Sequence, residues 1–369
     1  MGEKTMAEEL VLRCALAKGF LYNPAAANAL VERYEGVENL YWNSRDKGLE
    51  PFKDVLDSSF SESSLRWAEE EVAWCARKGV KLLFHGEKGY PRLLGECNDA
   101  PHMLYYKGNA GLNNPRCISM VGTRLASRYG KECCSRIVEH LAEYSPLIVS
   151  GLAYGIDIAV HKAALSAGLE TVAVLPNGID SIYPSGHRDI AAQMVHQGGI
   201  LTEFPRGEAP RRLNFIKRNR IIAAMARAVI VVESRVKGGS MITAELAGGY
   251  GREIFAVPGR MTDANSFGCN YLIAKNVAAA YNCASAVPSA LGWNAGEGSD
   301  VALQPQLFSF EVEKKEKLLL SLKFDTPMDV ERVCAATGFD WGEASMLLLE
   351  LELEGKVQVT DNMEYCLRK

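Results

Sequence analysis

Glycines and basic residues follow short apolar runs in this sequence, a combination suited to binding phosphate groups. The clearest example is the stretch Arg116–Arg128, in which the mostly apolar residues 117–121 are followed by Gly122, Thr123 and Arg124. Glycine lets the backbone turn sharply and approach a ligand closely. Ser127 is a suitable N-cap, and the N-terminus of a helix attracts anions. This stretch therefore predicts an anion site between a buried strand and a helix.

A second signal is the segment 206–220, RGEAPRRLNFIKRNR, in which six basic residues accompany Phe215 and only one acidic residue, Glu208. Positive charge neutralises the phosphates of single-stranded nucleic acid, and an aromatic ring stacks on its bases. The segment taken alone fits equally well a solvated helix start with Phe215 in the core. The candidate nucleic-acid contacts within it are Phe215, Lys217, Arg218, Asn219 and Arg220.

Several motifs of catalysis and cofactor binding are missing from the sequence. There is no GxxxxGK[ST] phosphate loop, no GxGxxG dinucleotide fingerprint and no GxSxG nucleophile turn. The six histidines do not stand near cysteines or carboxylates at the spacing of metal ligands. We therefore predict a binding protein without a catalytic residue, a cofactor or a metal.

A regular alternation of apolar runs, loops and helical stretches between about 116 and 281 predicts how these residues are positioned. It favours a Rossmann-like, doubly wound parallel sheet with helices on both faces, in which ligands bind at the carboxyl ends of the strands. A short strand over Met103–Gly108 precedes it. The predicted strands are Cys117–Val121, Leu147–Ser150, Thr171–Leu175, Gly199–Glu203, Ala228–Glu233 and Glu253–Val257, with helices starting near Ser127, Ile156, His187, Lys217, Ser240 and Cys269.

The flanking regions predict two smaller domains. Residues 1–82 favour a helical domain, either a packing domain or a helix-hairpin-helix-like binder, with helices at Glu8–Ala17, Ala25–Tyr34 and Glu62–Lys78. Residues 83–287 form the α/β core, and 288–309, rich in Gly, Ser, Ala, Pro and Gln, form a linker.

Residues 310–369 predict a winged helix, with helices over Glu313–Leu322, from Pro327 to Gly338 and over Asp340–Leu353, and a hairpin over Lys356–Leu367 that turns at Asp361-Asn362. The third helix is acidic, and carboxylates repel a phosphate backbone. We therefore expect this domain to contact protein, or nothing, rather than DNA.

Composition sets the expected compartment. The 369 residues carry a net charge of −4 and ten cysteines without CxxC spacing, which favours reduced thiols in the cytoplasm. The N-terminus lacks the basic and apolar pattern of a signal peptide, and no apolar run approaches the roughly 20 residues of a membrane span. We predict no membrane association, and any basic footprint must be local.

The order of the motifs resembles the DNA-processing protein A family, DprA or Smf, over about residues 88–280. The motifs that carry this resemblance are VGTR at 121–124, SGLAxGID at 150–157 with His161, Tyr183-Pro184, RNRII at 218–222, GSMITA at 239–244, AVPG at 256–259 and GCNYLI at 268–273. Tyr154, Ile216 and the run 274–277 depart from the usual residues of the family.

The resemblance implies a Rossmann-like protein that binds single-stranded DNA without catalysis. It implies protection of incoming strands during natural transformation, loading of the RecA recombinase, displacement of single-strand-binding protein, and a homodimer. Carried over by motif, Arg124 pairs with a phosphate and Lys217, Arg218 and Arg220 form a second basic wall. The donors are Gly122, Thr123, Ser150 and Gly151; Gly239, Ser240 and Thr243 line the same crest; Leu272 and Ile273 lie in the dimer interface.

Two other functions fit parts of the sequence. Related Rossmann-like enzymes hydrolyse nucleotide N-glycosidic bonds with a glycine-rich turn and a nearby glutamate, and Gly238-Gly239-Ser240 with Glu245 could mimic that arrangement. A pure protein scaffold fits the acidic last domain but leaves the basic crest unexplained.

Overall fold

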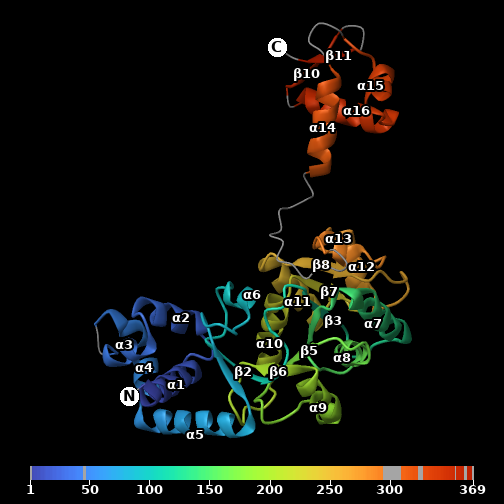
Figure 1. Cartoon of the computed structure of the whole chain (residues 1–369). Coiled ribbons are helices and arrows are strands. Elements are labelled where there is room, and N and C mark those ends of the chain that lie inside the picture. Colours follow the sequence, from blue (N-terminus) through green and yellow to red (C-terminus); the bar gives the residue numbers. More distant parts are fainter. Residues whose placement is uncertain are drawn as a thin grey trace. The chain divides into compact units, whose positions relative to one another are not determined.

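The computed structural model describes residues 2–44, 47–293, 309–322, 327–353, 355–360 and 364–367. The chain divides into two compact units, residues 1–297 and 298–369. Figure 1 traces both units along the chain. None of the helices in the described ranges has the length and apolar character that crossing a membrane requires.

The first unit begins with helices that have a small core of their own, including Leu16, Leu40 and Leu56. Ser61 caps the N-terminus of α5 (Glu62–Lys78), and Gly79 ends this helix in the left-handed conformation. The helices lie beside one edge of the sheet (Figure 1). Their bounds are α1 Gly2–Gly19, α2 Pro24–Arg33, α3 Val37–Trp42, the 3-10 helix Lys47–Phe52, α4 Lys53–Ser59 and α5 Glu62–Lys78.

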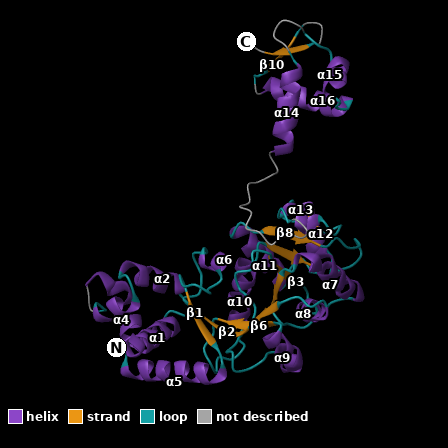
Figure 2. Cartoon of the chain, in the orientation of Figure 1, coloured by secondary structure: helices purple, strands orange, loops and turns teal. Residues whose placement is uncertain are grey.

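A nine-stranded sheet follows, in the order β1-β2-β6-β5-β4-β3-β7-β8-β9. Figure 2 draws the strands in orange and the helices in purple. From β3 the chain winds outward through β4, β5 and β6, then returns to place β7, β8 and β9 on the other side of β3. The topological switch point therefore lies between β3 and β7. The strands are β1 Lys81–Phe84, β2 Met103–Gly108, β3 Cys117–Val121, β4 Leu147–Ser150, β5 Thr171–Val174, β6 Gly198–Thr202, β7 Ala228–Val231, β8 Glu253–Ala256 and β9 Ala279–Ala280.

The predicted Rossmann-like sheet is confirmed for β3 to β8, which are parallel. At the edge, β2 runs antiparallel to both β1 and β6, and β1 was not predicted. β3 is buried on both faces. Ile118 and Met120 pack with α7 (Arg128–Leu141) and α8 (Ile156–Ser166), while Cys117 and Val121 pack with α10 (Arg212–Met225) and α11 (Gly239–Gly249). Burial on both faces explains why its side chains are apolar except at Ser119, whose hydroxyl donates to the Ile222 carbonyl at 2.6 Å.

The remaining helices of the first unit connect these strands. α9 packs beside β6, and α12 lies against the β8 side of the sheet. Their bounds are α6 Arg92–Gly95, α7 Arg128–Leu141, the 3-10 helix Ala142–Tyr144, α8 Ile156–Ser166, the 3-10 helix Ser185–His187, α9 Arg188–His196, α10 Arg212–Met225, α11 Gly239–Gly249, α12 Phe267–Ala274 and α13 Ala286–Ala290.

The second unit has the three helices and the hairpin of a winged helix. Asp329 caps the second helix, Gly338 ends it, and Leu318, Val333 and Leu348 lie in the core. The proposed turn at Asp361-Asn362 lies outside the described residues. The elements are α14 Ser309–Ser321, α15 Val330–Thr337, α16 Trp341–Leu353, β10 Val357–Val359 and β11 Tyr365–Leu367.

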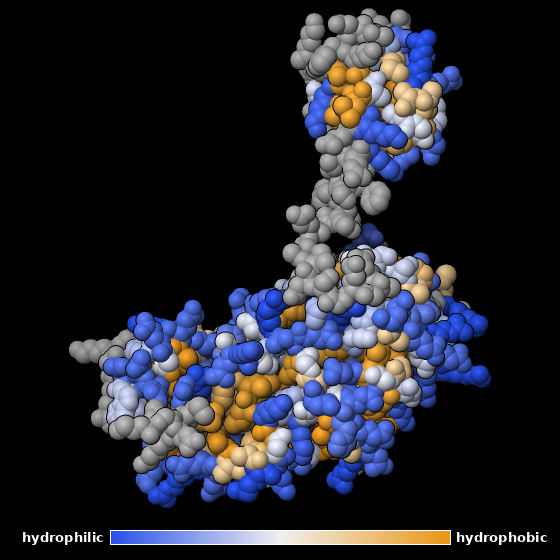
Figure 3. Space-filling view, in the orientation of Figure 1, coloured by the Kyte–Doolittle hydropathy of each residue, from blue (hydrophilic) through white to orange (hydrophobic). Residues whose placement is uncertain are grey.

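Two acidic side chains of α16 form ion pairs with α14, Glu343 with Lys314 and Glu350 with Lys315. Apolar side chains stand exposed on the same helix, among them Trp341 and Leu349. Figure 3 shows apolar atoms on the surface of this unit among hydrophilic ones. The prediction that this domain contacts protein rather than DNA remains a prediction.

Buried histidines make the stability of the first unit depend on pH. Burial lowers the pKa of His161 to about 3, and its Nδ1 lies 2.7 Å from the Thr171 hydroxyl. The unfolded chain binds a proton below about pH 6.5, whereas the folded chain does so only near pH 3, so stability falls as pH falls through this window. Between pH 7.5 and 5 we expect His161 to account for about 2 kcal/mol of lost unfolding free energy.

Urea unfolding at the two pH values measures this effect. His161→Asn should reduce the pH dependence of the unfolding free energy by about 2 kcal/mol. His196→Asn, at an exposed histidine, should leave it unchanged. An equal pH dependence in the parent and His161→Asn would contradict the assignment.

Candidate nucleic-acid interface

An open pocket of about 580 Å³ lies at the switch point, where β3 and β7 end side by side. Its walls come from the loops after these two strands, from the start of α8, from one face of α10 and from the start of α11. We call it the switch-point pocket. Among its lining residues are Gly122, Thr123, Arg124, Asp157, Arg212, Phe215, Arg218, Asn219, Arg235, Lys237, Gly239, Ser240 and Thr243.

The loop between β3 and α7 is held by hydrogen bonds at both ends. Thr123 N donates to the Glu233 carbonyl at 2.7 Å, and the Thr123 carbonyl accepts from Ile156 N at 3.1 Å. The Glu233 carboxylate accepts from the Ser127 amide at 2.9 Å and from its hydroxyl at 2.5 Å. Gly122 is required here because a Cβ would lie 2.5 Å from the side chain of Ile156. A fixed loop therefore presents the exposed Arg124.

Helix periodicity decides which residues of the basic segment reach the pocket. α10 begins at Arg212, five residues earlier than predicted. Positions 212, 215, 216, 219 and 222 recur at helical spacing and line the pocket. Lys217 and Arg220 belong to other faces of the helix and do not line it.

Arg218 is a buried positive charge in the pocket wall. Its Nη1 donates to the carbonyls of Gly151 at 2.6 Å and Val174 at 2.8 Å, and its Nε donates to Asn219 Oδ1 at 3.2 Å. Burial lowers its pKa to about 10, and the neighbouring Asp157 opposes that shift. Burial also raises the pKa of Asp157 above its ordinary value, while Arg218 acts in the opposite direction. The hydrogen bonds to the Gly151 and Val174 carbonyls fix the guanidinium in the pocket wall.

The Arg124 guanidinium and two aromatic rings, those of Phe215 and Tyr183, form a cluster beside the pocket, which we call the Arg124 cluster. The Arg124 guanidinium carbon lies 4.8 Å from the centre of the Phe215 ring. Phe215 meets Tyr183 edge-on, with 5.8 Å between ring centres. Both rings are partly exposed. The Arg124 cluster offers aromatic faces to the planar part of a ligand and an exposed positive charge to its anionic part.

α11 directs its N-terminus at the pocket. In the described structure Gly238 precedes the helix without a side-chain cap. The Ser240 hydroxyl donates to Ser234 Oγ at 2.8 Å, and Thr243 is buried one turn further along. The first amides of α11 therefore add partial positive charge to the basic wall.

Four of the predicted DNA contacts do not line the pocket: Ser150, Gly151, Lys217 and Arg220. The Ser150 hydroxyl donates to the Met120 carbonyl at 2.6 Å. Gly151 acts on the pocket indirectly, because its carbonyl accepts a hydrogen bond from Arg218. Lys217 donates to the Leu21 carbonyl and lies 4.4 Å from the Tyr22 ring centre, and burial lowers its pKa.

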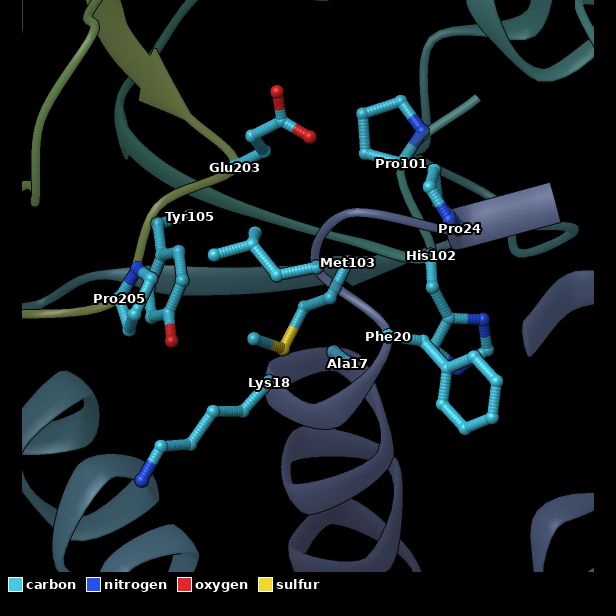
Figure 4. Close-up of a pocket in the computed structure, with 11 residues that line it drawn as sticks. Ala17, Lys18, Phe20, Pro24, Pro101, His102, Met103, Tyr105, Glu203 and Pro205 are labelled. Carbon is cyan, nitrogen blue, oxygen red and sulfur yellow. The ribbon is translucent and has the colours of Figure 1, made fainter. Parts of the chain in front are cut away.

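Arg220 forms a buried ion pair with Glu203 and donates to the Asp99 carbonyl. Lys217 and Arg220 thus join the N-terminal helices and the connector to the core. Figure 4 shows the small cavity at this junction, lined by Tyr105 of β2, by Glu203 directly after β6, by Ala17 near the end of α1 and by Phe20 directly after it.

The predicted dimer residues lie away from the pocket, and the alternative enzyme site is divided: Gly238, Gly239 and Ser240 line the pocket, whereas Glu245 does not. Leu272 belongs to the core under the sheet, and Ile273 is partly buried against it. The large apolar side chains that α12 exposes are Phe267 and Tyr271. Glu245 is exposed on α11 and does not line the switch-point pocket. Within the described ranges no group of three or more His, Cys, Asp or Glu side chains could hold a metal ion.

Sequence reasoning missed several lining residues. Arg235 and Lys237 follow β7 and could have been found as basic residues after a strand. Tyr183 does not line the pocket but contacts Phe215, which does; it comes from the long segment after β5, and its sequence neighbours do not indicate this contact. Asp157 belongs to a motif quoted above, but its pairing with Arg218 had no sequence signal.

The chain matches two family models. One, described as DNA recombination-mediator protein A, matches residues 81–292, and the other, the DprA winged helix domain, matches residues 311–361. The chain is 42% identical over 184 residues to the DNA processing protein DprA of Streptococcus pneumoniae. This alignment covers 50% of this chain and 65% of that protein.

Solved structures agree with this family. The X-ray structure of DprA from Streptococcus pneumoniae aligns with a TM-score of 0.56 at 32% identity, covering 68% of this chain and 92% of that one. DNA processing protein A from Helicobacter pylori, whose structure addresses its single-stranded DNA binding mode, aligns with a TM-score of 0.52 at 29% identity, covering 57% of this chain and 95% of that one. Because the first model matches more than half of the sequence, this chain belongs to the DNA recombination-mediator protein A family.

Proposed function

We propose that this chain binds single-stranded DNA in the switch-point pocket. The observation that carries the proposal is the cluster of Arg124, Phe215 and Tyr183, two of whose members line the same pocket as the buried Arg218 guanidinium. Exposed cations bind phosphates and exposed rings bind unpaired bases, so the pocket suits a single strand better than a duplex. Support also comes from the Helicobacter pylori relative, which binds single-stranded DNA.

A comparison of Arg124→Ala with the parent chain tests this proposal. We expect Arg124→Ala to weaken binding to a single strand by about 10-fold, because Arg124 supplies both an exposed charge and a stacked plane. The slope of log affinity against log salt should fall by about 0.7. Gel shifts at two salt concentrations, with single- and double-stranded oligonucleotides, measure affinity, slope and strand preference.

Arg33 offers a matched control, because its guanidinium lies 5.7 Å from the Tyr34 ring centre on the N-terminal helices, away from the pocket. Arg33→Ala should bind as the parent does. Equal affinity of the parent for single and double strands, or full binding by Arg124→Ala, would refute the proposed site.

Family membership supports finer roles for this binding. We infer that the chain protects incoming single strands during natural transformation in the cytoplasm and helps to load the RecA recombinase, displacing single-strand-binding protein. RecA filament formation on strands covered by single-strand-binding protein would test that role, and a lack of stimulation would refute it. A homodimer through α12 would use Phe267 and Tyr271 rather than Leu272, and sedimentation equilibrium measures it.

We propose that the pocket binds without catalysis. The carboxylate that lines it, Asp157, is buried beside Arg218, and Glu245 lies outside. Incubation with nucleoside monophosphates tests the alternative enzyme, since release of free base would contradict a purely binding role.

A further inference from the structure

A second groove, of about 900 Å³, adjoins the switch-point pocket. Its walls are the first turn of α7 and the loop between β8 and α12. We call it the α7 groove. Arg235 and Glu233 line the α7 groove, and Arg235 also lines the switch-point pocket, so the two share a wall.

Hydrogen bonds build the α7 groove from segments far apart in the sequence. Asn265 Nδ2 donates to the Leu125 carbonyl at 2.9 Å, and Asn265 Oδ1 accepts from Arg235 Nε at 3.3 Å. The Tyr129 hydroxyl donates to the Pro258 carbonyl at 2.7 Å. These bonds tie the β8–α12 loop to the β3–α7 loop and orient Arg235 on the shared wall.

The lining of the α7 groove is positively charged. Arg128, Arg235 and Arg260 are exposed. The carboxylates among the lining residues are Asp263, which is exposed, and Glu233, which is buried and accepts hydrogen bonds from Ser127. Arg128 makes an exposed pair with Glu132 at 2.8 Å, of a kind that contributes little and is readily exchanged.

We propose that a single DNA strand leaving the switch-point pocket passes Arg235 and continues through the α7 groove, where Arg128 and Arg260 contact its phosphates. The partly exposed Tyr129 ring, held by its hydroxyl, offers a base a surface on which to stack. This inference rests on the proposed function and extends it to longer strands, because a short strand fills the first pocket alone.

Fluorescence anisotropy with oligothymidines of about 5 and about 15 nucleotides tests the path. Arg128→Ala/Arg260→Ala should bind the longer strand about 10-fold more weakly, with a salt slope lower by about 1.4 for two lost phosphates, and should bind the shorter strand as the parent does. Arg66→Ala/Arg77→Ala is the matched control, because Arg66 makes a similar exposed pair with Glu62 on α5. This control should bind both strands as the parent does.

Arg124→Ala separates the two proposals, because it should weaken binding to both lengths. If Arg124→Ala weakens binding while Arg128→Ala/Arg260→Ala binds the longer strand like the parent, the α7 groove is not part of the path. If Arg124→Ala changes the affinity for neither the shorter nor the longer strand, the switch-point pocket does not bind DNA as proposed. The path through the α7 groove is then refuted as well.

Discussion

Replacing Arg220 by methionine is expected to destabilise the first unit by about 3–5 kcal/mol, a large share of the stability of a domain. The side chains of Arg220 and Glu203 are only 8% and 2% exposed and form an ion pair. Methionine fills a similar volume but leaves the Glu203 carboxylate buried without its counter-charge. Urea unfolding followed by tryptophan fluorescence measures the loss.

A second substitution distinguishes the ion pair from simple packing. Arg220→Met/Glu203→Leu should recover most of the stability, because replacing both partners of a buried pair by apolar residues is often neutral. Arg211→Met, at an exposed arginine 3.6 Å from Glu208, changes the same basic segment and should cost less than about 1 kcal/mol. If the double variant were no more stable than Arg220→Met, the carboxylate would not be the source of the loss.

The same variants divide the basic segment by function. Arg220→Met/Glu203→Leu should bind single-stranded DNA with the affinity of the parent, since Arg220 does not line the switch-point pocket. If the double variant were stable but failed to bind single-stranded DNA, Arg220 would have to belong to the DNA interface after all.

The core strands could be predicted from the sequence because burial on both faces favours apolar residues along most of each strand. β3 and β4 were predicted at their observed bounds, and β8 to within one residue. β1 was missed because it is a four-residue edge strand that begins with the exposed Lys81. Such a strand has neither a long apolar run nor a clear alternation.

The direction of the basic side chains could be predicted only in part. The charges of the segment 206–220 suggested one wall, whereas helical phase separates Arg218 from Lys217 and Arg220. The helix was predicted to start near Lys217, and its true start at Arg212 would have revealed that phase. The contact of Phe215 with Tyr183 depends on the path of a long loop, which local patterns do not encode.

Gly155→Ala should have the largest expected effect on DNA binding, a loss of roughly 30- to 100-fold, although residue 155 is absent from the pocket lining. Gly155 has φ +82°, and a Cβ there would lie 2.2 Å from the Thr123 carbonyl oxygen and 2.6 Å from the Arg124 backbone. The β3–α7 loop must move away, which displaces Arg124 and breaks the bond from Ile156 N to the Thr123 carbonyl. Anisotropy with a short oligothymidine measures the loss.

Gly168 provides the control that isolates this collision. It has φ +75° at the other end of α8, and a Cβ there meets nothing within 4 Å. Gly168→Ala therefore carries the strain of a left-handed alanine, about 1 kcal/mol, without displacing any part of the pocket. Its DNA affinity should equal that of the parent, while thermal unfolding reports the strain. Both variants carry the strain of a left-handed alanine, but only Gly155→Ala also collides with the β3–α7 loop. Equal DNA affinity of the two variants would therefore mean that the collision has no effect on binding, and that the β3–α7 loop does not position Arg124 for the strand.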